Sequence, residues 1–259
     1  MKLALYQVDA FTNQVFKGNP AAVCPLDHWL PDDLLQQIAS ENNLSETAFF
    51  VKHGAAYQLR WFTPSMEVDL CGHATLASAH VLFNHMDFKG ISVTFTSQSG
   101  ELIVSKEDSV MCLDFPSRPG ERCAVPNALI EGLGHVPREV LKARDYMAIY
   151  DHEDDVAALQ PDFERLRSLD TLGIIVTARG KSVDFVSRFF APGAGIDEDP
   201  VTGSAHCTLI PYWANTLKKQ KLTAKQISKR TGELFCDNLD SRVHIAGQAV
   251  TYLEGTINL

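Results

Sequence analysis

The sequence predicts an α+β protein with two pseudo-symmetric halves, each a barrel-like, mostly antiparallel sheet around one central helix. Short motifs recur in the same order about 130 residues apart. Each half contains one helix that is apolar nearly all round, and alternating segments typical of strands surround it. These three observations indicate a duplicated unit of strands and helices.

The internal repeat rests on three pairs of short motifs. A single match could arise by chance, but three matches in one order at nearly one offset indicate duplication. The paired motifs are Pro31 with Pro161, Arg60-Trp61-Phe62-Thr63-Pro64 with Arg188-Phe189-Phe190-Ala191-Pro192, and residues 71–76 with residues 202–207.

The predicted order within each half is helix, strand, strand, central helix and further strands. The first helices, at 31–42 and 161–169, begin near a proline and carry acidic residues in the first turn, where they suit the helix dipole. Strands follow at 47–51 and 172–177, and a second strand in each half ends in the Arg-x-Phe-x-Pro motif. The later strands are expected at 91–96, 101–106, 110–115, 221–228, 232–236 and 242–252.

Each central helix is opened by a glycine. After Gly72, the helix expected at 73–84 has almost no polar face, so it should be buried. After Gly203, the helix expected at 204–215 is similar until Pro211, which is predicted to kink or end it. Each half is therefore expected to wrap a curved sheet or barrel around its helix.

The boundary between the halves is expected in the Pro-rich, polar segment 116–126. This gives an N-terminal half-domain at 1–115 and a C-terminal half-domain at 116–259, with the final strands free to pack back on the first half. The first half would carry Glu46 and His73, and the second half would carry Asp199 and Ser204.

Composition narrows the class of protein. The 259 residues carry a formal net charge of −9, which argues against nucleic acid or an anionic membrane as a partner. The N-terminus lacks the pattern of a signal peptide, and no apolar run is long enough to span a membrane, so a cytoplasmic protein is expected. The six cysteines form no CxxC pair and are expected to be reduced thiols without a structural zinc site.

The two halves differ at the residues that suit proton chemistry. Glu46 corresponds to an apolar segment at 173–176, and His73 corresponds to Ser204. The second half also has a longer connection before its glycine, which contains Asp199. In a duplicated scaffold, such one-sided acidic and imidazole groups indicate acid–base chemistry.

The N-termini of the two central helices suit an anionic substrate. Unpaired N–H groups and a partial positive charge at Gly72 and Gly203 could bind a carboxylate or a developing oxyanion. Glu46, His73 and Asp199 are then the candidates for moving a proton.

Each candidate also has an ordinary structural explanation. Glu46 could be an acid at a strand start, and His73 could simply lie in the first turn of a core helix. Asp199 and Asn19, each followed by proline, could be turn residues, and Ser204 could be only a helix cap. From the residues alone, these alternatives stay open.

Four segments of the chain resemble the phenazine-biosynthesis-protein-F-like isomerase family over about residues 4 to 256. The segments are Gly18-Asn19-Pro20-Ala21-Ala22-Val23, residues 43–49, residues 69–75 and residues 198–205. The resemblance implies the diaminopimelate-epimerase-like fold, with two pseudo-symmetric halves and a site in the cleft between them. It also implies an isomerase that needs no metal or organic cofactor, a small anionic substrate and a homodimer.

By this resemblance, Glu46 is the acid/base that shuttles the proton. His73 and Asp199 are implied to contact and orient the substrate. Substrate binding is assigned to Gly72, Gly203, Ser204 and Asn19.

Three rival functions remain. An amino-acid racemase on the same fold would use two opposed cysteines, but the repeat counterpart of Cys71 is Thr202. A non-catalytic protein that binds a small acid needs no proton shuttle, so the joint presence of four residues counts against it: Glu46, His73, Asp199 and Ser204. A metalloenzyme is disfavoured because His73 and His80 are too far apart along one helix to share an ion readily.

Overall fold

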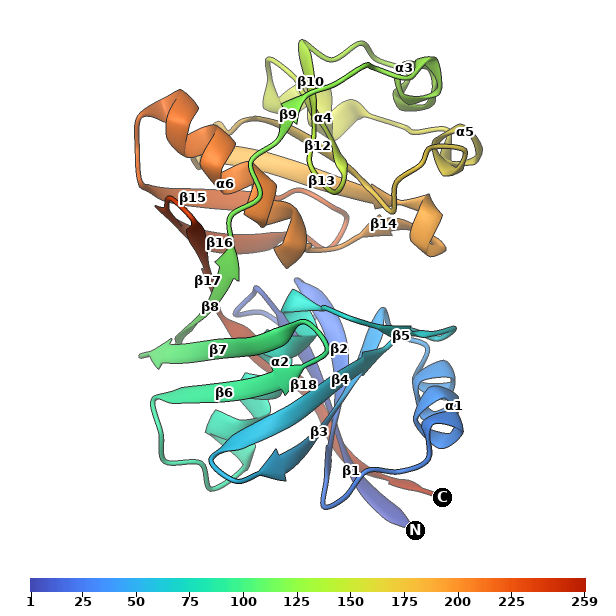
Figure 1. The fold of residues 1–259 in the computed structure, drawn as a ribbon, viewed down its shortest axis with the longest axis vertical. Coiled ribbons are helices and arrows are strands. Elements are labelled where there is room, and N and C mark those ends of the chain that lie inside the picture. Colours follow the sequence, from blue (N-terminus) through green and yellow to red (C-terminus); the bar gives the residue numbers. More distant parts are fainter. The chain divides into compact units, whose positions relative to one another are not determined.

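The computed structural model describes residues 1–259, which divide into two compact units (Figure 1). The first unit contains Met1–Asp114 and Ile245–Leu259, and the second contains Phe115–His244. The boundary near residue 115 agrees with the expected one. The final strand does pack back on the first half, as the sequence analysis allowed, since it pairs antiparallel with the first strand of the chain. The structure is of the mixed α+β class.

The first unit is made of strands and two helices. Its elements are β1 (Lys2–Ala10), β2 (Asn19–Leu26), α1 (Asp32–Asn42), β3 (Glu46–His53), β4 (Ala56–Phe62), β5 (Glu67–Val68), α2 (Gly72–His85), β6 (Ser92–Ser97), β7 (Gly100–Glu107) and β18 (Ala249–Asn258). The chain passes between the units within β8 (Val110–Pro116) and again within β17 (Arg242–Gly247).

The second unit contains the remaining elements. They are β9 (Glu121–Arg122), α3 (Asn127–Leu133), β10 (Glu139–Lys142), β11 (Tyr146–Ile149), α4 (Glu153–Ala158), α5 (Phe163–Arg167), β12 (Ile174–Arg179), β13 (Phe185–Ala191), the 3₁₀ turn Pro192–Ala194, β14 (Ile196–Asp199), α6 (Gly203–Leu217), β15 (Lys221–Gln226) and β16 (Gly232–Leu239).

The same sequence of strand pairings occurs in both units. In the first, β2 and β3 are parallel, β3 and β4 are antiparallel, and β4 and β6 are parallel. In the second, the pairs β11–β12, β12–β13 and β13–β15 repeat these orientations. Parallel neighbours require a crossover connection, and α1, α2, α5 and α6 lie in these connections. The matching topology agrees with the repeat in the sequence.

The central helices α2 and α6 are buried, as their apolar sequences predict. In α2, Leu76, Val81 and Leu82 are fully buried, and the helix packs against β1, β2 and β3. In α6, Leu209 and Ile210 are likewise fully buried. Burial on every side explains why neither helix has a polar face.

Pro211 does not end α6, which continues to Leu217. Proline has no N–H group, so it leaves the carbonyl of Cys207, four residues earlier, without its helical partner. The backbone N–H of Arg118 donates to that carbonyl at 2.9 Å. This outside donor satisfies the carbonyl and allows the helix to continue through the proline.

Two other predicted elements differ from the structure. The helix expected at 161–169 is only the short α5, which is capped by Asp162 through a hydrogen bond from the N–H of Arg165. The single strand expected at 242–252 is two strands, β17 and β18, with a break at Gln248. The alternating sequence predicted extended backbone correctly, but the two parts pair with different neighbours, β8 and β1.

Strand β3 is covered on both faces, by α1 on one side and by α2 on the other. Phe49 and Val51 pack with α1 in one hydrophobic cluster. Side chains alternate along a strand, so Glu46, Ala48 and Phe50 lie on the opposite face, against which α2 packs. Glu46 is therefore on the same face of the sheet as the central helix.

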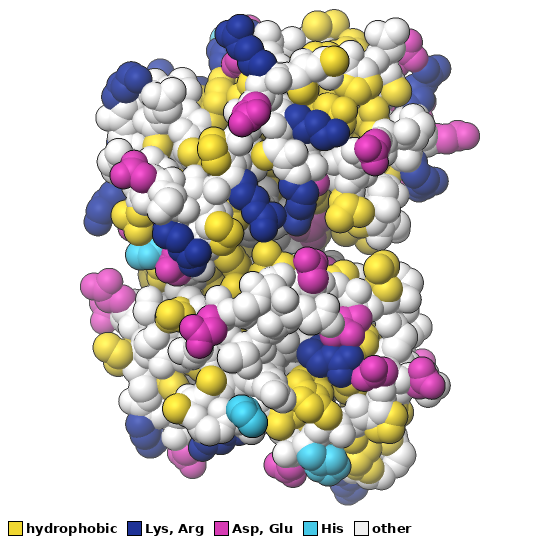
Figure 2. Space-filling view, in the orientation of Figure 1, with side chains coloured by type: hydrophobic (Ala, Val, Ile, Leu, Met, Phe, Trp, Pro, Cys, Tyr) yellow, Lys and Arg dark blue, Asp and Glu magenta, His cyan; other side chains and the backbone are white.

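The surface carries charges of both signs. On the face shown in Figure 2, Lys and Arg side chains are interspersed with Asp and Glu, and no continuous basic surface covers that face. None of the helices has the length and apolarity needed to span a membrane.

We expect Leu76→Ala to lower the free energy of unfolding by about 2–5 kcal/mol, because it leaves a cavity beside a fully buried helix. Leu239→Ala is the matched control, since Leu239 is 47% exposed and its replacement should cost less than about 1 kcal/mol. Urea denaturation followed by circular dichroism measures both. Equal effects would contradict the assignment of α2 to the core.

Candidate active site

The first unit brings Glu46 and His73 into contact. Glu46 is the first residue of β3, and His73 is in the first turn of α2. The Oε2 atom of Glu46 lies 3.1 Å from Nε2 of His73. Neither atom forms a hydrogen bond, so the contact is an ion pair by distance. The carboxylate and the imidazole therefore form one acid–base group.

The other ring nitrogen of His73 contacts Asn19 and Cys71. Nδ2 of Asn19 lies 3.1 Å from Nδ1, and Sγ of Cys71 lies 3.5 Å from the same atom. Asn19 is the first residue of β2 and is fully buried, so of the alternatives left open by the sequence, a turn residue is the one that the structure does not support. Contacts on both sides of the ring fix the orientation of the imidazole.

Local structure explains why these residues converge. Cys71 is the N-cap of α2, and its backbone carbonyl accepts hydrogen bonds from the N–H and the hydroxyl of Thr75. The parallel register places Ala21 of β2 opposite Glu46 of β3. Glu46 and Asn19 thus come from adjacent strands at the end where α2 begins.

The electrostatics of the group favour a protonated His73. Burial lowers the pKa of the imidazole, but its contacts with Cys71 and Glu46 outweigh burial and hold that pKa well above its ordinary value. Burial, followed by the nearby Glu46, raises the pKa of the Cys71 thiol to about 11, so this thiol is neutral at pH 7. The Glu46 carboxylate is therefore the partner that stabilises the imidazolium at neutral pH.

The same three residues offer donors of the kinds that bind a transition metal. One ligand atom each from Glu46, Cys71 and His73 lies within 4.8 Å of the others. Metal binding would require proton loss from a thiol of raised pKa and from a stabilised imidazolium, which opposes it. His80 is not in this group, since its ring contacts Thr251 of β18.

In the second unit, Asp199 lies at the end of β14 in a network of buried polar groups. The hydroxyl of Thr202 donates a short hydrogen bond to Oδ2 of Asp199. Gln226 is fully buried; it accepts from the N–H of Thr202 at 2.9 Å and donates to the carbonyl of Asp199 at 2.7 Å. This network holds the connection before Gly203 in one conformation.

Ser204 lies in the first turn of α6, but it is not the helix cap, which is Thr202. Its hydroxyl accepts a hydrogen bond from Nη2 of Arg144 at 3.1 Å. The same guanidinium pairs with the buried carboxylate of Asp145 at 2.9 Å. A positive side chain thus lies at the N-terminus of α6, where the helix dipole also favours an anion.

Sequence reasoning missed Arg144 and Gln226. Neither belongs to a repeated motif. Gln226 lies in the basic stretch 218–230, whose sequence is typical of a solvated helix end followed by a strand. No local pattern identifies them, because each contacts the start of α6 from a part of the chain that is distant in sequence. Arg144 contacts Ser204, and Gln226 contacts Thr202.

The geometry agrees with comparisons to known proteins. A family model described as phenazine biosynthesis-like protein, PhzC-PhzF, matches residues 8–255. An uncharacterized isomerase from Pseudomonas aeruginosa is 53% identical over 259 residues and is aligned over 100% of both chains. The chain belongs to the PhzF family.

Solved structures show the same fold. The crystal structure of a PhzF family protein from Enterococcus faecalis has a TM-score of 0.97 and 50% identity, with 100% of both chains covered. A hydroxyproline epimerase from Agrobacterium vitis has a TM-score of 0.63 at 11% identity, covering 100% of this chain and 93% of that one. The latter likeness shows the fold alone.

We expect Glu46→Gln to lower the pKa of His73, because it removes the negative charge that stabilises the imidazolium while keeping the side-chain volume. A ¹⁵N–¹H NMR titration of the histidine rings measures the pKa directly. Glu41→Gln on α1 is the control for loss of one acid elsewhere. An unchanged pKa of His73 in Glu46→Gln would contradict the proposed electrostatic coupling.

The same pair predicts how stability changes with pH. The pKa of His73 in the folded protein is raised above its ordinary value of 6.5, so the stabilisation is fully present below pH 6.5 and is lost as pH rises through the folded pKa. The difference in free energy of unfolding between wild type and Glu46→Gln should therefore shrink from pH 6 toward alkaline pH. Urea denaturation at several pH values measures this difference. A difference that grows as pH rises would contradict the prediction.

Proposed function

We propose that this protein is a cofactor-independent isomerase that moves a proton between carbon atoms of a small carboxylate-containing metabolite. The contact between Glu46 and His73 is the observation that carries the proposal. The proposal also draws on family membership and on the relative from P. aeruginosa that is named an isomerase. It includes a barrel-like, diaminopimelate-epimerase-like arrangement of each half.

In the proposed reaction, the Glu46 carboxylate takes a proton from an acidic C–H bond of the substrate. The electron pair of that bond moves into the conjugated system of the substrate, and Glu46 then returns the proton to a different carbon. The imidazolium of His73 stabilises the charge that develops and holds the carboxylate in place. Protons and electrons balance within the substrate and Glu46, so no redox partner is required.

Further residues are assigned by the family resemblance. Gly72 and Gly203 are the first residues of the two central helices. Their backbone N–H groups are suited to bind the carboxylate of a substrate. Asp199 and Ser204 are proposed to contact the substrate. Asn19, which was predicted to bind substrate, is fully buried beside His73, so we propose that it orients the imidazole.

The two-cysteine racemase mechanism is less well supported. It needs two thiolates, and burial raises the pKa of Cys71 and of Cys207 to about 11 in each case. Cys207 also lies inside α6 with 3% of its surface exposed. A homodimer, which the family resemblance implies, and a cytoplasmic location, which the N-terminal sequence and the short apolar runs favour, remain parts of the proposal.

Hydrogen exchange in D₂O tests the reaction. The protein is incubated with small carboxylic acids that have acidic C–H bonds, including dihydro-hydroxyanthranilate, and deuterium incorporation is followed by NMR. Wild type is expected to exchange a proton of at least one acid, and Glu46→Gln to be slower by about 10²–10⁴-fold.

Cys71→Ser is the control for the thiol mechanism and should retain exchange within about threefold, because its thiol is neutral at pH 7. A loss equal to that of Glu46→Gln would favour the racemase mechanism. Binding of an acid without exchange by wild type would favour a protein that only binds small acids.

A further inference from the structure

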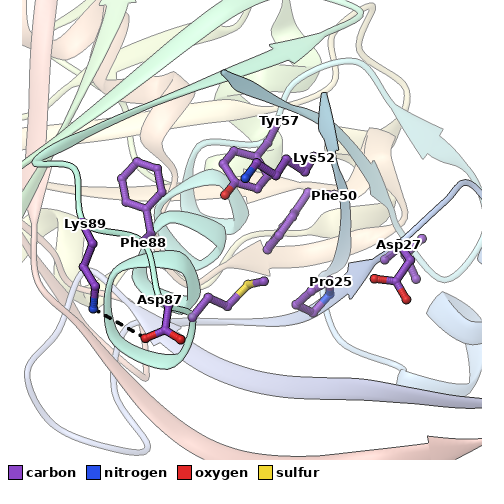
Figure 3. Close-up of a pocket in the computed structure, with 10 residues that line it drawn as sticks. Pro25, Asp27, Phe50, Lys52, Tyr57, Asp87, Phe88 and Lys89 are labelled. Carbon is purple, nitrogen blue, oxygen red and sulfur yellow. Dashed lines mark ion pairs between the residues drawn. The ribbon is translucent and has the colours of Figure 1, made fainter. Parts of the chain in front are cut away.

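We propose that the first unit has a second binding site, at the opposite end of β3 from Glu46, for a small aromatic monocarboxylate. The site is a pocket of about 570 Å³ with an aromatic wall and a polar edge formed by Tyr57 and Lys52 (Figure 3). It requires neither the proposed reaction nor the group at His73.

The pocket is separate from Glu46 although both lie on the same strand and face. Phe50 follows Glu46 by four residues, which corresponds to about 13 Å along an extended strand. The pocket and the group at His73 also lie at opposite ends of α2, because His73 is in the first turn of this helix and Met86 is its C-cap. Met86 lines the pocket together with the following Phe88.

The wall of the pocket is built from packed aromatic rings. The rings of Phe50 and Tyr57 meet edge to face, with centroids 5.5 Å apart, and Phe88 packs against Tyr57 at 6.2 Å. Pro25 and Met86 complete the apolar lining. Faces and edges of this kind favour a flat aromatic ring, which can stack or pack edge-on against them.

Tyr57 gives the pocket a hydrogen-bond donor on a largely buried ring. Only 8% of Tyr57 is exposed, its hydroxyl forms no hydrogen bond in the structure, and Figure 3 shows that hydroxyl directed into the pocket. Burial raises the pKa of this phenol, so it remains a protonated donor. This hydroxyl makes no hydrogen bond within the protein, so it is free to donate to an acceptor bound in the pocket.

Lys52 supplies the charge that selects an anion. Lys52 and Tyr57 are directly opposite each other in the antiparallel pair β3–β4, so their side chains lie on the same face of the sheet. Lys52 forms no ion pair, whereas the other lysine of the pocket, Lys89, pairs with Asp87 at 3.5 Å. A carboxylate that accepts from the Tyr57 hydroxyl would therefore meet an ammonium group that forms no ion pair within the protein.

The acidic residues at the edge limit the ligand to one negative charge. Asp27 and Asp87 also line the pocket, and both are exposed. A second carboxylate on the ligand would be repelled by them, whereas the uncharged end of an aromatic acid would not. The arrangement thus fits a ring against Phe50 and Phe88, with its single carboxylate at Lys52 and Tyr57.

The test uses the intact protein labelled with ¹³C at its methionine methyl groups. Only five methionines are present, and Met86 lines the pocket, so its resonance, assigned with Met86→Leu, reports binding there. Benzoate is the probe, with benzamide as its uncharged analogue and phthalate as the dianion. We expect benzoate to shift the Met86 resonance saturably, with benzamide and phthalate each binding at least about fivefold more weakly.

Variants separate the two polar contacts from general packing. Tyr57→Phe and Lys52→Gln should each weaken benzoate binding by about tenfold, because each loses a hydrogen bond to a charged group. Lys89→Gln is the matched control and should change it by less than about twofold, since Lys89 is already paired. Lys52→Gln should also abolish the preference for benzoate over benzamide.

Three results would overturn the proposal. One is the absence of any shift of the Met86 resonance up to about 10 mM benzoate, because a preformed site should have a dissociation constant below that concentration. Another is equal binding by wild type and both variants. The third is a shift that disappears in Glu46→Gln but not in Tyr57→Phe, which would place benzoate at the proposed active site. Failure of hydrogen exchange would leave this binding result unaffected.

Discussion

The ion pair between Glu46 and His73 is the constraint around which the first unit is arranged. The pair can form only where the start of β3 contacts the first turn of α2, so β3 must pack against the central helix. A protonated imidazole at a helix N-terminus is opposed by the helix dipole, and the nearby carboxylate offsets that effect. The contact therefore depends on both elements being held rigidly.

The burial of α2 provides that rigidity. Because apolar side chains surround the helix, it cannot turn or slide without opening cavities, so its first turn stays fixed relative to β2 and β3. Its two ends then occupy different environments on the same face of β3. One end has the buried polar group of Glu46 and His73, and the other has the aromatic pocket beside Phe88.

The second unit uses the same topology to hold different chemistry. The start of α6 has Ser204 where α2 has His73, and its hydroxyl is paired with Arg144. The connection before α6 is fixed by Asp199, Thr202 and Gln226. The two units thus share the strand pairings and the helix burial that the core requires, but they differ in the residues at the helix N-termini.

The sequence by itself determined the repeat, the two buried helices and the candidates Glu46 and His73, because periodicity and apolarity are local properties of the chain. It did not determine that α6 continues through Pro211, since the donor that permits this, Arg118, is distant in sequence. Only the tertiary structure placed Arg144 beside Ser204 and Tyr57 beside Lys52 in a pocket. Such contacts depend on strand register and packing, which bring together residues that no local pattern relates.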